Sequence, residues 1–446
     1  MPSNVKTRFA PSPTGTLHVG NMRAALLNWL YTRKMGGEIV LRFDDTDTAR
    51  STRAFADAIE ADLAWGGLTF DAITRQSDRI ATYDAAAGTL KADGLLYPCY
   101  ETPAELDRRR KRQLSQGKPP VYDRAALELT DDDRARLEAD GRTPHWRFRL
   151  SGTKVMWNDL IRGPQSIETA SVSDPVLIRE DGTYTYMLPS SVDDAEMGIT
   201  HVLRGEDHVT NTAAQIELLQ AVGAQLPAFA HFPLMVAPGG AKLSKREGGA
   251  SVQDVRERGL EPGALTSYLA HLGTSDDVKA ASLDDLIEGF EFSKFGRAPA
   301  HYDVADLGRL NTDLLHTASL ADVTARLDGL GLTISEDLWL AIRGNLERLS
   351  DAAIWVQVAD GEITPIIEDA DFAAKAAAVL PASPWDETTW KTWTDAVKAE
   401  TGAKGKGLFM PLRKALTGLD HGPELKALLP LIGRAKVLAR LRNKAT

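Results

Sequence analysis

Residues 5–43 of this 446-residue chain read VKTRFAPSPTGTLHVGNMRAALLNWLYTRKMGGEIVLRF. Residues 5–10 alternate as a short strand does, and the turn-forming PSPTG at 11–15 ends that strand. A core-facing stripe at helical spacing follows, formed by Met22, Ala25, Leu26, Trp29 and Leu30. Residues 38–43 then have the pattern of a second strand. Strand, helix and strand within roughly forty residues indicate a parallel sheet.

The rest of the chain predicts an α/β domain with an insertion, followed by helices. Residues 55–95 have a helical pattern. Residues 90–182 have a different residue pattern, which we interpret as an insertion into the α/β domain. Short strand-like segments lie around 146–150, 154–157, 175–178, 184–188 and 201–204. A helix follows around Ile216, and helical periodicity dominates from about Ser251 onward.

The composition is that of an ordinary globular protein, with 43% hydrophobic and 26% charged residues. The absence of any stretch of about 18 apolar residues excludes membrane insertion. Residues 1–6 lack the apolar run of a signal peptide. The single cysteine, Cys99, allows neither an internal disulfide nor a cysteine-rich zinc site. We therefore expect a cytoplasmic protein.

The net charge of −10 is unevenly distributed. From Ala403 to the end, six lysines and four arginines face only Asp420 and Glu424, so this segment carries +8 and residues 1–402 carry −18. An acidic body argues against a protein that coats DNA, whereas a basic end suits a polyanion contacted at chosen places. A solvated charged face is the alternative for such a run.

Two segments could carry chemistry. Residues 16–21 (TLHVGN) lie between a strand and a helix, where free backbone N–H groups and the helix dipole suit a phosphate. His18 can donate to a phosphate oxygen, and Gly20 removes a side chain where a nucleotide would press on the backbone. Taken alone, however, a segment of this kind is more often a plain strand-to-helix turn.

The second segment is KLSKR at 242–246, which glycines flank on both sides. Two lysines and an arginine on such a loop can neutralise charge as a phosphoryl-bearing group departs. A solvated basic loop is the alternative. The chain contains neither Gly-x-x-x-x-Gly-Lys-Ser/Thr nor Gly-x-Gly-x-x-Gly, which argues against the P-loop and dinucleotide-binding folds.

Taken together, these segments resemble a glutamyl-tRNA synthetase. RFAPSPTG at 8–15 and LRFDDTD at 41–47 are similar to the start of that family. HVGN at 18–21 is similar to its HIGH signature and KLSKR to its KMSKS signature. GLFMPLR at 407–413 and GPEL at 422–425 resemble its C-terminal helical region. The likeness runs nearly end to end, in the right order.

The resemblance implies a fold and an activity. The fold would be α/β, with a class I Rossmann-like parallel-sheet catalytic domain split by an α/β insertion and followed by an all-helical C-terminal half. The implied bounds are 1–89 and 183–240 for the two catalytic halves, 90–182 for the acceptor-end insertion, 241–315 for a stem-contact domain with the KLSKR loop, and 316–446 for the anticodon-binding helices. Such enzymes activate glutamate with ATP and transfer it to the 3′ end of a tRNA.

The resemblance also assigns residues to ATP. His18 would contact the phosphates, and Lys245 would hold the triphosphate during displacement, so these two are the expected catalytic residues. The expected ATP-binding residues are Thr14, His18, Gly20, Asn21, Lys242, Ser244 and Lys245. Lys242 and Arg246 are weaker candidates than Lys245.

By the same resemblance, the glutamate-binding residues would be Arg8, Ala10, Ser12, Asp44, Tyr186, Ser190 and Arg204. A guanidinium fork suits a carboxylate, so Arg8 and Arg204 are expected near the carboxylates of glutamate. Asp44 stands where bacterial relatives commonly have Glu, and Ser190 where some have Asn. Without the family context, Arg8, Arg204 and Asp44 would be assigned to surface ion pairs.

The implied partners are glutamate, ATP with Mg²⁺, and a glutamate-accepting tRNA; charging of glutamine tRNA stays open. Neither DNA nor a membrane is expected as a partner, and the chain should be a monomer. Some relatives carry a zinc knuckle in the insertion, but Cys99-Tyr100 has no cysteine partners and a structural zinc needs four ligands. We therefore predict no metal at a protein site.

The residues that contact RNA are harder to identify from the sequence than those that bind ATP and glutamate. Arg108–Arg112 with Lys118 could meet the acceptor arm, and a solvated helix face is an equal alternative. Relatives read the anticodon through C-terminal helices by stacking and base-edge contacts. Aromatic and basic residues of that part are Trp355, Trp385, Trp390, Trp393, Arg413 and Lys414. Aromatics in helices are usually core, so the sequence does not assign them.

Four other classes of protein agree less well with the sequence. A glutaminyl-tRNA synthetase would end in β-barrels, whereas residues 310–446 have helical periodicity. The paralogue that glutamylates queuosine in tRNA lacks the C-terminal half. A non-catalytic RNA-binding descendant should have lost part of the ATP or amino-acid constellation, and a generic nucleotidyltransferase would not need about 200 residues of additional helical chain.

Overall fold

The computed structural model describes residues 5–241, 243 and 251–442. The chain forms two compact units, one of residues 1–256 with 265–304, and one of residues 257–264 with 305–446. Among the described residues, no helix is both long and apolar enough to cross a bilayer.

The first unit begins with a parallel sheet in the order β1-β2-β3. Its strands are β1 (Lys6–Phe9), β2 (Glu38–Phe43) and β3 (Ala72–Arg75). Helices α1 (Val19–Lys34), α2 (Arg53–Trp65) and α3 (Ile80–Ala92) follow the strands along the chain. The predicted strand-helix-strand unit is therefore confirmed. The uniform helical pattern predicted for 55–95 is wrong at β3, a four-residue edge strand that is partly exposed and thus lacks a clear apolar period.

A second sheet has the order β7-β6-β10-β9. Its strands are β6 (Lys154–Asp159), β7 (Gly163–Glu168), β9 (His201–Gly205) and β10 (Ala228–Phe232). β6 and β7 form an antiparallel hairpin, and β10 runs parallel to both β6 and β9. The backbone N–H of Thr200 donates to the carbonyl of Lys6 at 2.9 Å, which links β9 to β1.

Helix α6 (Met187–Glu196) precedes β9 in the sequence, and helix α7 (Val209–Ala221) lies between β9 and β10. The strand-like pattern at 184–188 is wrong beyond its first residues, because α6 begins at Met187. Tyr184 forms only an isolated bridge with Ile178.

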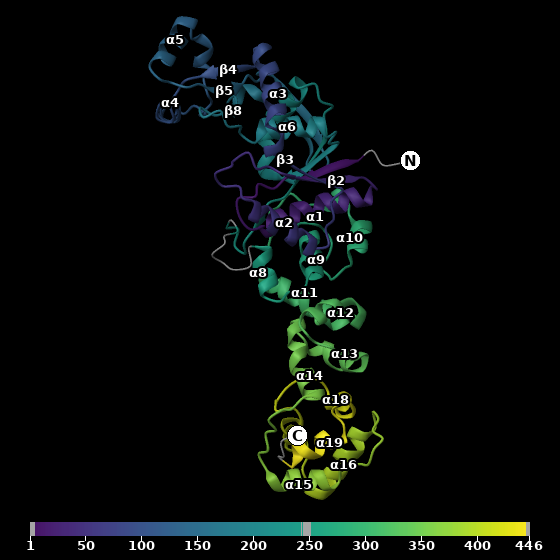
Figure 1. Cartoon of the computed structure of the whole chain (residues 1–446). Helices are drawn as coiled ribbons and strands as arrows, with labels where there is room; N and C mark the ends of the chain where they lie inside the picture. The colour runs from purple at the N-terminus through teal and green to yellow at the C-terminus, as the bar shows by residue number, and fades with distance from the viewer. Residues whose placement is uncertain (1–4, 242, 244–250, 443–446) are drawn as a thin grey trace. The chain divides into compact units, whose positions relative to one another are not determined.

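A third, antiparallel sheet has the order β4-β5-β8. It contains β4 (Leu96–Cys99), β5 (His145–Phe148) and β8 (Val176–Ile178). Figure 1 shows this sheet beside α4 (Pro103–Ser115) and α5 (Asp131–Ala139). α4 carries the basic run of the sequence and buries none of its residues.

The remaining elements of the first unit follow the second sheet. β11 (Met235–Val236) pairs in parallel with β12 (Ala300–His301). Helices α8 (Val252–Glu257), α9 (Pro262–His271) and α10 (Leu283–Gly289) lie between these strands in sequence.

The second unit is built of helices around one core. The helices are α11 (Val304–Thr317), α12 (Leu320–Gly329), α13 (Glu336–Ile342), α14 (Ala352–Asp360), α15 (Ala370–Ala378), α16 (Thr389–Thr401), α17 (Lys406–Thr417), α18 (Leu425–Ile432) and α19 (Arg434–Leu441). Trp339 and Trp393 are fully buried in that core. The prediction of an all-helical C-terminal half is confirmed.

Candidate active site

Two arginines on neighbouring parallel strands share one carboxylate oxygen. Arg8 on β1 donates through Nε to Oδ1 of Asp194 at 3.0 Å. Arg42 on β2 donates through Nη1 to the same oxygen at 2.8 Å. Asp194 lies on α6 and is buried, as are both arginines. Buried charged side chains of β1, β2 and α6 therefore meet at one place in the first unit.

Charge and burial oppose each other in this network. Burial disfavours the ionised carboxylate of Asp194, but the charges of Arg8 and Arg42 hold its pKa below the usual range. Burial also disfavours the charged guanidinium of Arg42, and Asp44 and Asp194 overcome this effect and raise its pKa. Because a buried charge without a partner is costly, each of these groups depends on the others.

Asp44 and Ser190 complete the network around Arg42. Arg42 donates through Nε to Oδ1 of Asp44 at 2.8 Å and through Nη2 to Oγ of Ser190 at 2.9 Å. Burial raises the pKa of Asp44, and attraction to Arg42 and Arg8 opposes that rise. The backbone N–H of Asp44 also donates to the carbonyl of Pro11 at 3.0 Å, which ties the PSPTG turn to the end of β2.

Arg42 and Asp194 were not among the predicted site residues. A signal for Arg42 was present, because β2 is otherwise an apolar run of the kind that parallel sheets bury on both faces. An arginine at a fully buried position needs a charged partner. No comparable local signal marks Asp194, which meets Arg42 only through the tertiary fold.

Arg204 on β9 is held by three neutral partners. Its Nε donates to Nε2 of His231 at 3.2 Å, Nη1 to Oε1 of Gln215 at 2.7 Å and Nη2 to Oγ1 of Thr212 at 2.8 Å. Burial, and then the nearby charge of Arg8, lower the pKa of Arg204 to about 10. The two predicted arginines thus share one electrostatic neighbourhood.

Tyr186 borders the same neighbourhood and is 42% exposed. Its hydroxyl accepts a hydrogen bond from Nδ2 of Asn211 at 2.7 Å, and its ring lies edge-on to that of His208. Burial raises the pKa of Tyr186, and the charge of Arg204 opposes the rise. Ala10 is half-buried and Ser12 is exposed, two and four residues after Arg8.

His18 is the N-cap of α1. Its Nδ1 accepts a hydrogen bond from the backbone N–H of Gly20 at 3.1 Å. The accepting nitrogen carries no proton, so the ring proton of the neutral form sits on Nε2. A Cβ on Gly20 would lie 3.3 Å from Nδ1, so the glycine makes room for this ring. Asn21 and Thr14 are exposed beside it.

The start of α1 also meets the chain that follows the KLSKR segment. His18 forms an isolated antiparallel bridge with Ser251, and the backbone N–H of Val252 donates to the carbonyl of Leu17 at 2.9 Å. Lys242, Ser244, Lys245 and Arg246 lie outside the described residues, so their placement stays a prediction.

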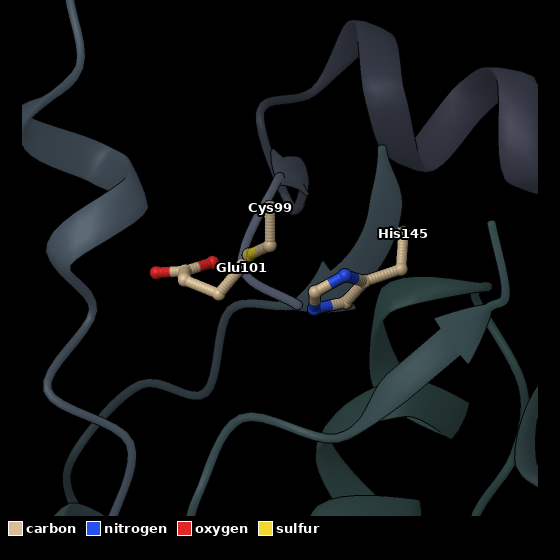
Figure 2. Close-up of side chains that lie close together, drawn as sticks. All are labelled: Cys99, Glu101 and His145. Carbon is tan, nitrogen blue, oxygen red and sulfur yellow. The ribbon is translucent and has the colours of Figure 1, made fainter. Parts of the chain in front are cut away.

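A cluster of possible metal ligands lies in the third sheet (Figure 2). Cys99 on β4, His145 on β5 and Glu101 bring their ligand atoms within 4.8 Å of one another. Burial raises the pKa of Cys99 to about 11 and lowers that of His145 to about 4. Tyr122 donates its hydroxyl proton to Oε1 of Glu101 at 2.8 Å.

This cluster offers three donors among the described residues, one fewer than a closed structural zinc site. The sequence pointed only to Cys99. Glu101 follows Cys99 by two residues, and His145 joins them because it lies opposite Cys99 in the pairing of β4 with β5. Nε2 of His145 and Oε2 of Glu101 are buried and lack a hydrogen-bond partner within the described part of the chain. The absence of zinc therefore stays a prediction that metal analysis can test.

Most of the aromatic residues left unassigned in the C-terminal half belong to the core of the second unit. Trp355 and Trp393 are buried, and Trp385 and Trp390 are partly buried against the same core. Phe409 on α17 is 46% exposed, with its ring 6.2 Å from that of Trp390.

The two basic candidates in this half bind to the protein itself. Arg413 donates to the carbonyl of Pro423 at 2.9 Å, and Lys414 pairs with Glu368 at 2.6 Å.

Two family models match the sequence. Residues 4–305 match the model described as class I tRNA synthetases (E and Q), catalytic domain. Residues 367–445 match the model described as an anticodon binding domain. The first match covers the four sheets of the described residues, and the second covers the helices from α15 onward.

Full-length relatives extend these matches. Glutamate–tRNA ligase 1 of Parvibaculum lavamentivorans is 58% identical over 437 residues, which are 97% of this chain and 97% of that protein. Glutamate–tRNA ligase 2 of a Methylobacterium species is 58% identical over 98% of this chain and 99% of its own. A crystal structure of a glutamate tRNA ligase from Elizabethkingia meningosepticum, in complex with its amino acid, has a TM-score of 0.83 at 27% identity and covers 98% of both chains.

Proposed function

The chain belongs to the glutamate–tRNA ligases of the class I tRNA synthetases, and we propose that its arginine-lined site joins glutamate to ATP and then to tRNA. It activates glutamate to glutamyl-adenylate with release of pyrophosphate, and transfers the glutamyl group to the 3′ end of its tRNA. The observation that carries the proposal is the buried network of Arg8, Asp194, Arg42 and Asp44 close to Arg204.

The amino-acid site follows from the charges of this network. Arg204 and Arg8 provide cations for the carboxylates of glutamate, and Asp44 provides an anion for its ammonium group. Tyr186 adds a hydroxyl at the border of the site. Ser190 acts through Arg42, which it helps to orient. Ala10 and Ser12 line the pocket after Arg8.

The nucleotide site lies at the start of α1. Backbone N–H groups and the positive end of the helix dipole attract the triphosphate, and His18 donates from Nε2 to a phosphate oxygen. Thr14, Gly20 and Asn21 border the same helix start. Lys242 and Lys245 of the KLSKR segment neutralise the departing pyrophosphate, and the hydroxyl of Ser244 donates a hydrogen bond to it. ATP enters as its Mg²⁺ complex, which shares that task.

Both chemical steps are displacements without a covalent enzyme intermediate. An oxygen of the glutamate α-carboxylate attacks the α-phosphorus of ATP, and the bond to pyrophosphate breaks. A ribose hydroxyl at the tRNA 3′ end then attacks the activated carbonyl carbon, loses its proton, and AMP leaves. Positioning and electrostatic stabilisation supply the catalysis.

The organisation expected from the sequence belongs to the same proposal. Residues 90–182 and 241–315 contact the acceptor arm and the stem, and 316–446 bind the anticodon. The protein works as a monomer in the cytoplasm, where its tRNA is found.

Exchange of labelled pyrophosphate into ATP tests the activity. Exchange should require glutamate, should not occur with glutamine, and is expected only when tRNA is present. Exchange driven by glutamine would move the chain to the sister specificity. Charging purified glutamate and glutamine tRNAs side by side then decides whether one or both are substrates.

A further inference from the structure

Three polar side chains line up across neighbouring strands of the second sheet. β6, β10 and β9 lie side by side, with Phe229 opposite Asp159 and His231 opposite Arg204 in the register. Asp159 is the last residue of β6, and its side chain contacts His231 on the neighbouring strand β10. The resulting order is carboxylate, imidazole and guanidinium.

Resting on the proposed function, we propose that Asp159 and His231 are positioning residues that fix the guanidinium of Arg204 for the side-chain carboxylate of glutamate. They thereby help the enzyme to reject glutamine. Neither residue was found from the sequence.

The first link of this chain sets the tautomer of His231. Oδ1 of Asp159 accepts backbone N–H groups from Ile161 at 3.0 Å, from Arg162 at 2.9 Å and from His231 at 3.3 Å. Oδ2 lies 2.5 Å from Nδ1 of His231. A carboxylate held in this way is an acceptor only, so the imidazole proton sits on Nδ1.

The second link uses the nitrogen that this arrangement leaves without a proton. Nε2 of His231 accepts from Nε of Arg204 at 3.2 Å, and the hydroxyl of Thr212 lies 3.0 Å from the same nitrogen. The ring of Phe229 stacks on His231 and also lies beneath the Arg204 guanidinium, which shields the contact from water. His231 is fully buried, and burial, followed by the effect of Arg204, lowers its pKa.

The third link concerns the donors that remain on Arg204. A guanidinium has five N–H donors, and the described residues His231, Gln215 and Thr212 take one each from Nε, Nη1 and Nη2. One N–H therefore remains on each of the two terminal nitrogens. Such a pair matches the two oxygens of a carboxylate. A carboxamide offers one oxygen and an NH₂ group, so glutamine would set a donor against a donor.

The variant Asp159→Asn tests the tautomer directly. The three backbone N–H groups keep the amide oxygen at the Oδ1 position, so the NH₂ group faces Nδ1 of His231. The imidazole proton then moves to Nε2 and meets the N–H of Arg204. We expect the KM for glutamate to rise about 10-fold to 100-fold, the range for leaving one buried donor unpaired. The KM for ATP should stay within about twofold of wild type, and glutamine should inhibit more strongly relative to glutamate.

Two substitutions of His231 test the same inference independently of whether Asp159→Asn folds. His231→Leu removes the acceptor and should reproduce the rise in glutamate KM, whereas His231→Gln keeps an acceptor oxygen and should restore most of the affinity. Phe232→Leu is the matched control, because Phe232 is the next residue of β10, is equally buried and packs against Phe295. It should lower the melting temperature without changing the ratio of the two KM values.

Unchanged glutamate KM and glutamine inhibition in folded Asp159→Asn and His231→Leu would overturn the inference. Equal rises in both KM values would do the same, since they would indicate a general structural role. A wild-type enzyme that gives no glutamate-dependent exchange would instead refute the proposed function. The two failures are therefore distinguishable.

Discussion

His18 accepts a hydrogen bond from the backbone of Gly20, with 3.1 Å between Nδ1 and the amide nitrogen. The side chain expected to contact ATP is thus also the cap of the helix that follows. This pairing fixes the tautomer of the ring and directs its proton through Nε2.

Gly20→Ala should separate activity from stability. The added methyl would lie 3.3 Å from Nδ1, so the His18 ring must shift by a few tenths of an ångström. Alanine favours a helix over glycine by up to about 1 kcal/mol, so the melting temperature should stay the same or rise. The exchange rate should fall about tenfold, as expected for a misplaced donor to the phosphates. A variant with full exchange activity would contradict the role of the ring position.

Lys245→Ala should lower the rate of adenylate formation by about 100-fold or more, because a preorganised contact with the transition-state charge is lost. The initial rate of pyrophosphate exchange at saturating ATP, glutamate and tRNA measures this step. The substitution Lys6→Ala, at a lysine that pairs with exposed Glu38, is the control and should leave the rate unchanged. A Lys245→Ala enzyme at full rate would show that the loop does not act on the phosphates.

Asp194→Asn should destabilise the first unit by about 3–5 kcal/mol, because it leaves two buried arginines without their shared carboxylate. Urea unfolding followed by tryptophan fluorescence measures the loss. Asp57→Asn is the control, since Asp57 pairs with exposed Arg53 one helical turn away, and should have a small effect. Equal stabilities of the two variants would show that the network does not hold the strands.

His145 should make stability depend on pH. Its pKa is about 4 in the folded chain and about 6.5 when unfolded, so between these values the unfolded state binds more protons. The unfolding free energy should therefore fall as the pH is lowered from about 6.5 towards 4. In His145→Gln, this contribution to the pH dependence of the unfolding free energy should disappear. Parallel urea titrations of both proteins at several pH values provide the test, and an unchanged slope would contradict it.

Metal analysis of washed protein should find no stoichiometric zinc at Cys99, Glu101 and His145. The described residues provide three ligands, one of them already bonded to Tyr122. A chelator should accordingly leave the melting temperature unchanged. One zinc per chain that disappears in Cys99→Ser would overturn this expectation.

The sequence predicted those parts of the fold that have a clear local period. The strand-helix-strand start and the helical C-terminal half follow from apolar spacing, and the structure has both. β3 was missed because its four residues are half exposed and show no alternation. Family resemblance supplied Arg8, Asp44 and Arg204 as site candidates, with Arg8 and Asp44 each lying in a short motif.

The partners of those candidates could not be predicted in the same way. Arg8 and Asp194 are 186 residues apart, and Asp159 and His231 are 72 apart. No local spacing encodes such pairs, because only the strand order and register bring them together. The positioning of a side chain therefore required the tertiary structure even where its identity did not.

The hairpin of β6 and β7 lies in the chain between β5 and β8, yet it joins β10, whereas β5 and β8 pair with each other. Neither sheet is encoded by one uninterrupted piece of sequence. Excising residues 90–182 as a cassette would strip two strands and Asp159 from the neighbouring sheet, so a shortened enzyme would have to keep the hairpin and join α3 to it directly. The sheet β4-β5-β8 and the sheet β7-β6-β10-β9 must also form together during folding, since the chain crosses from one to the other and back before either is complete.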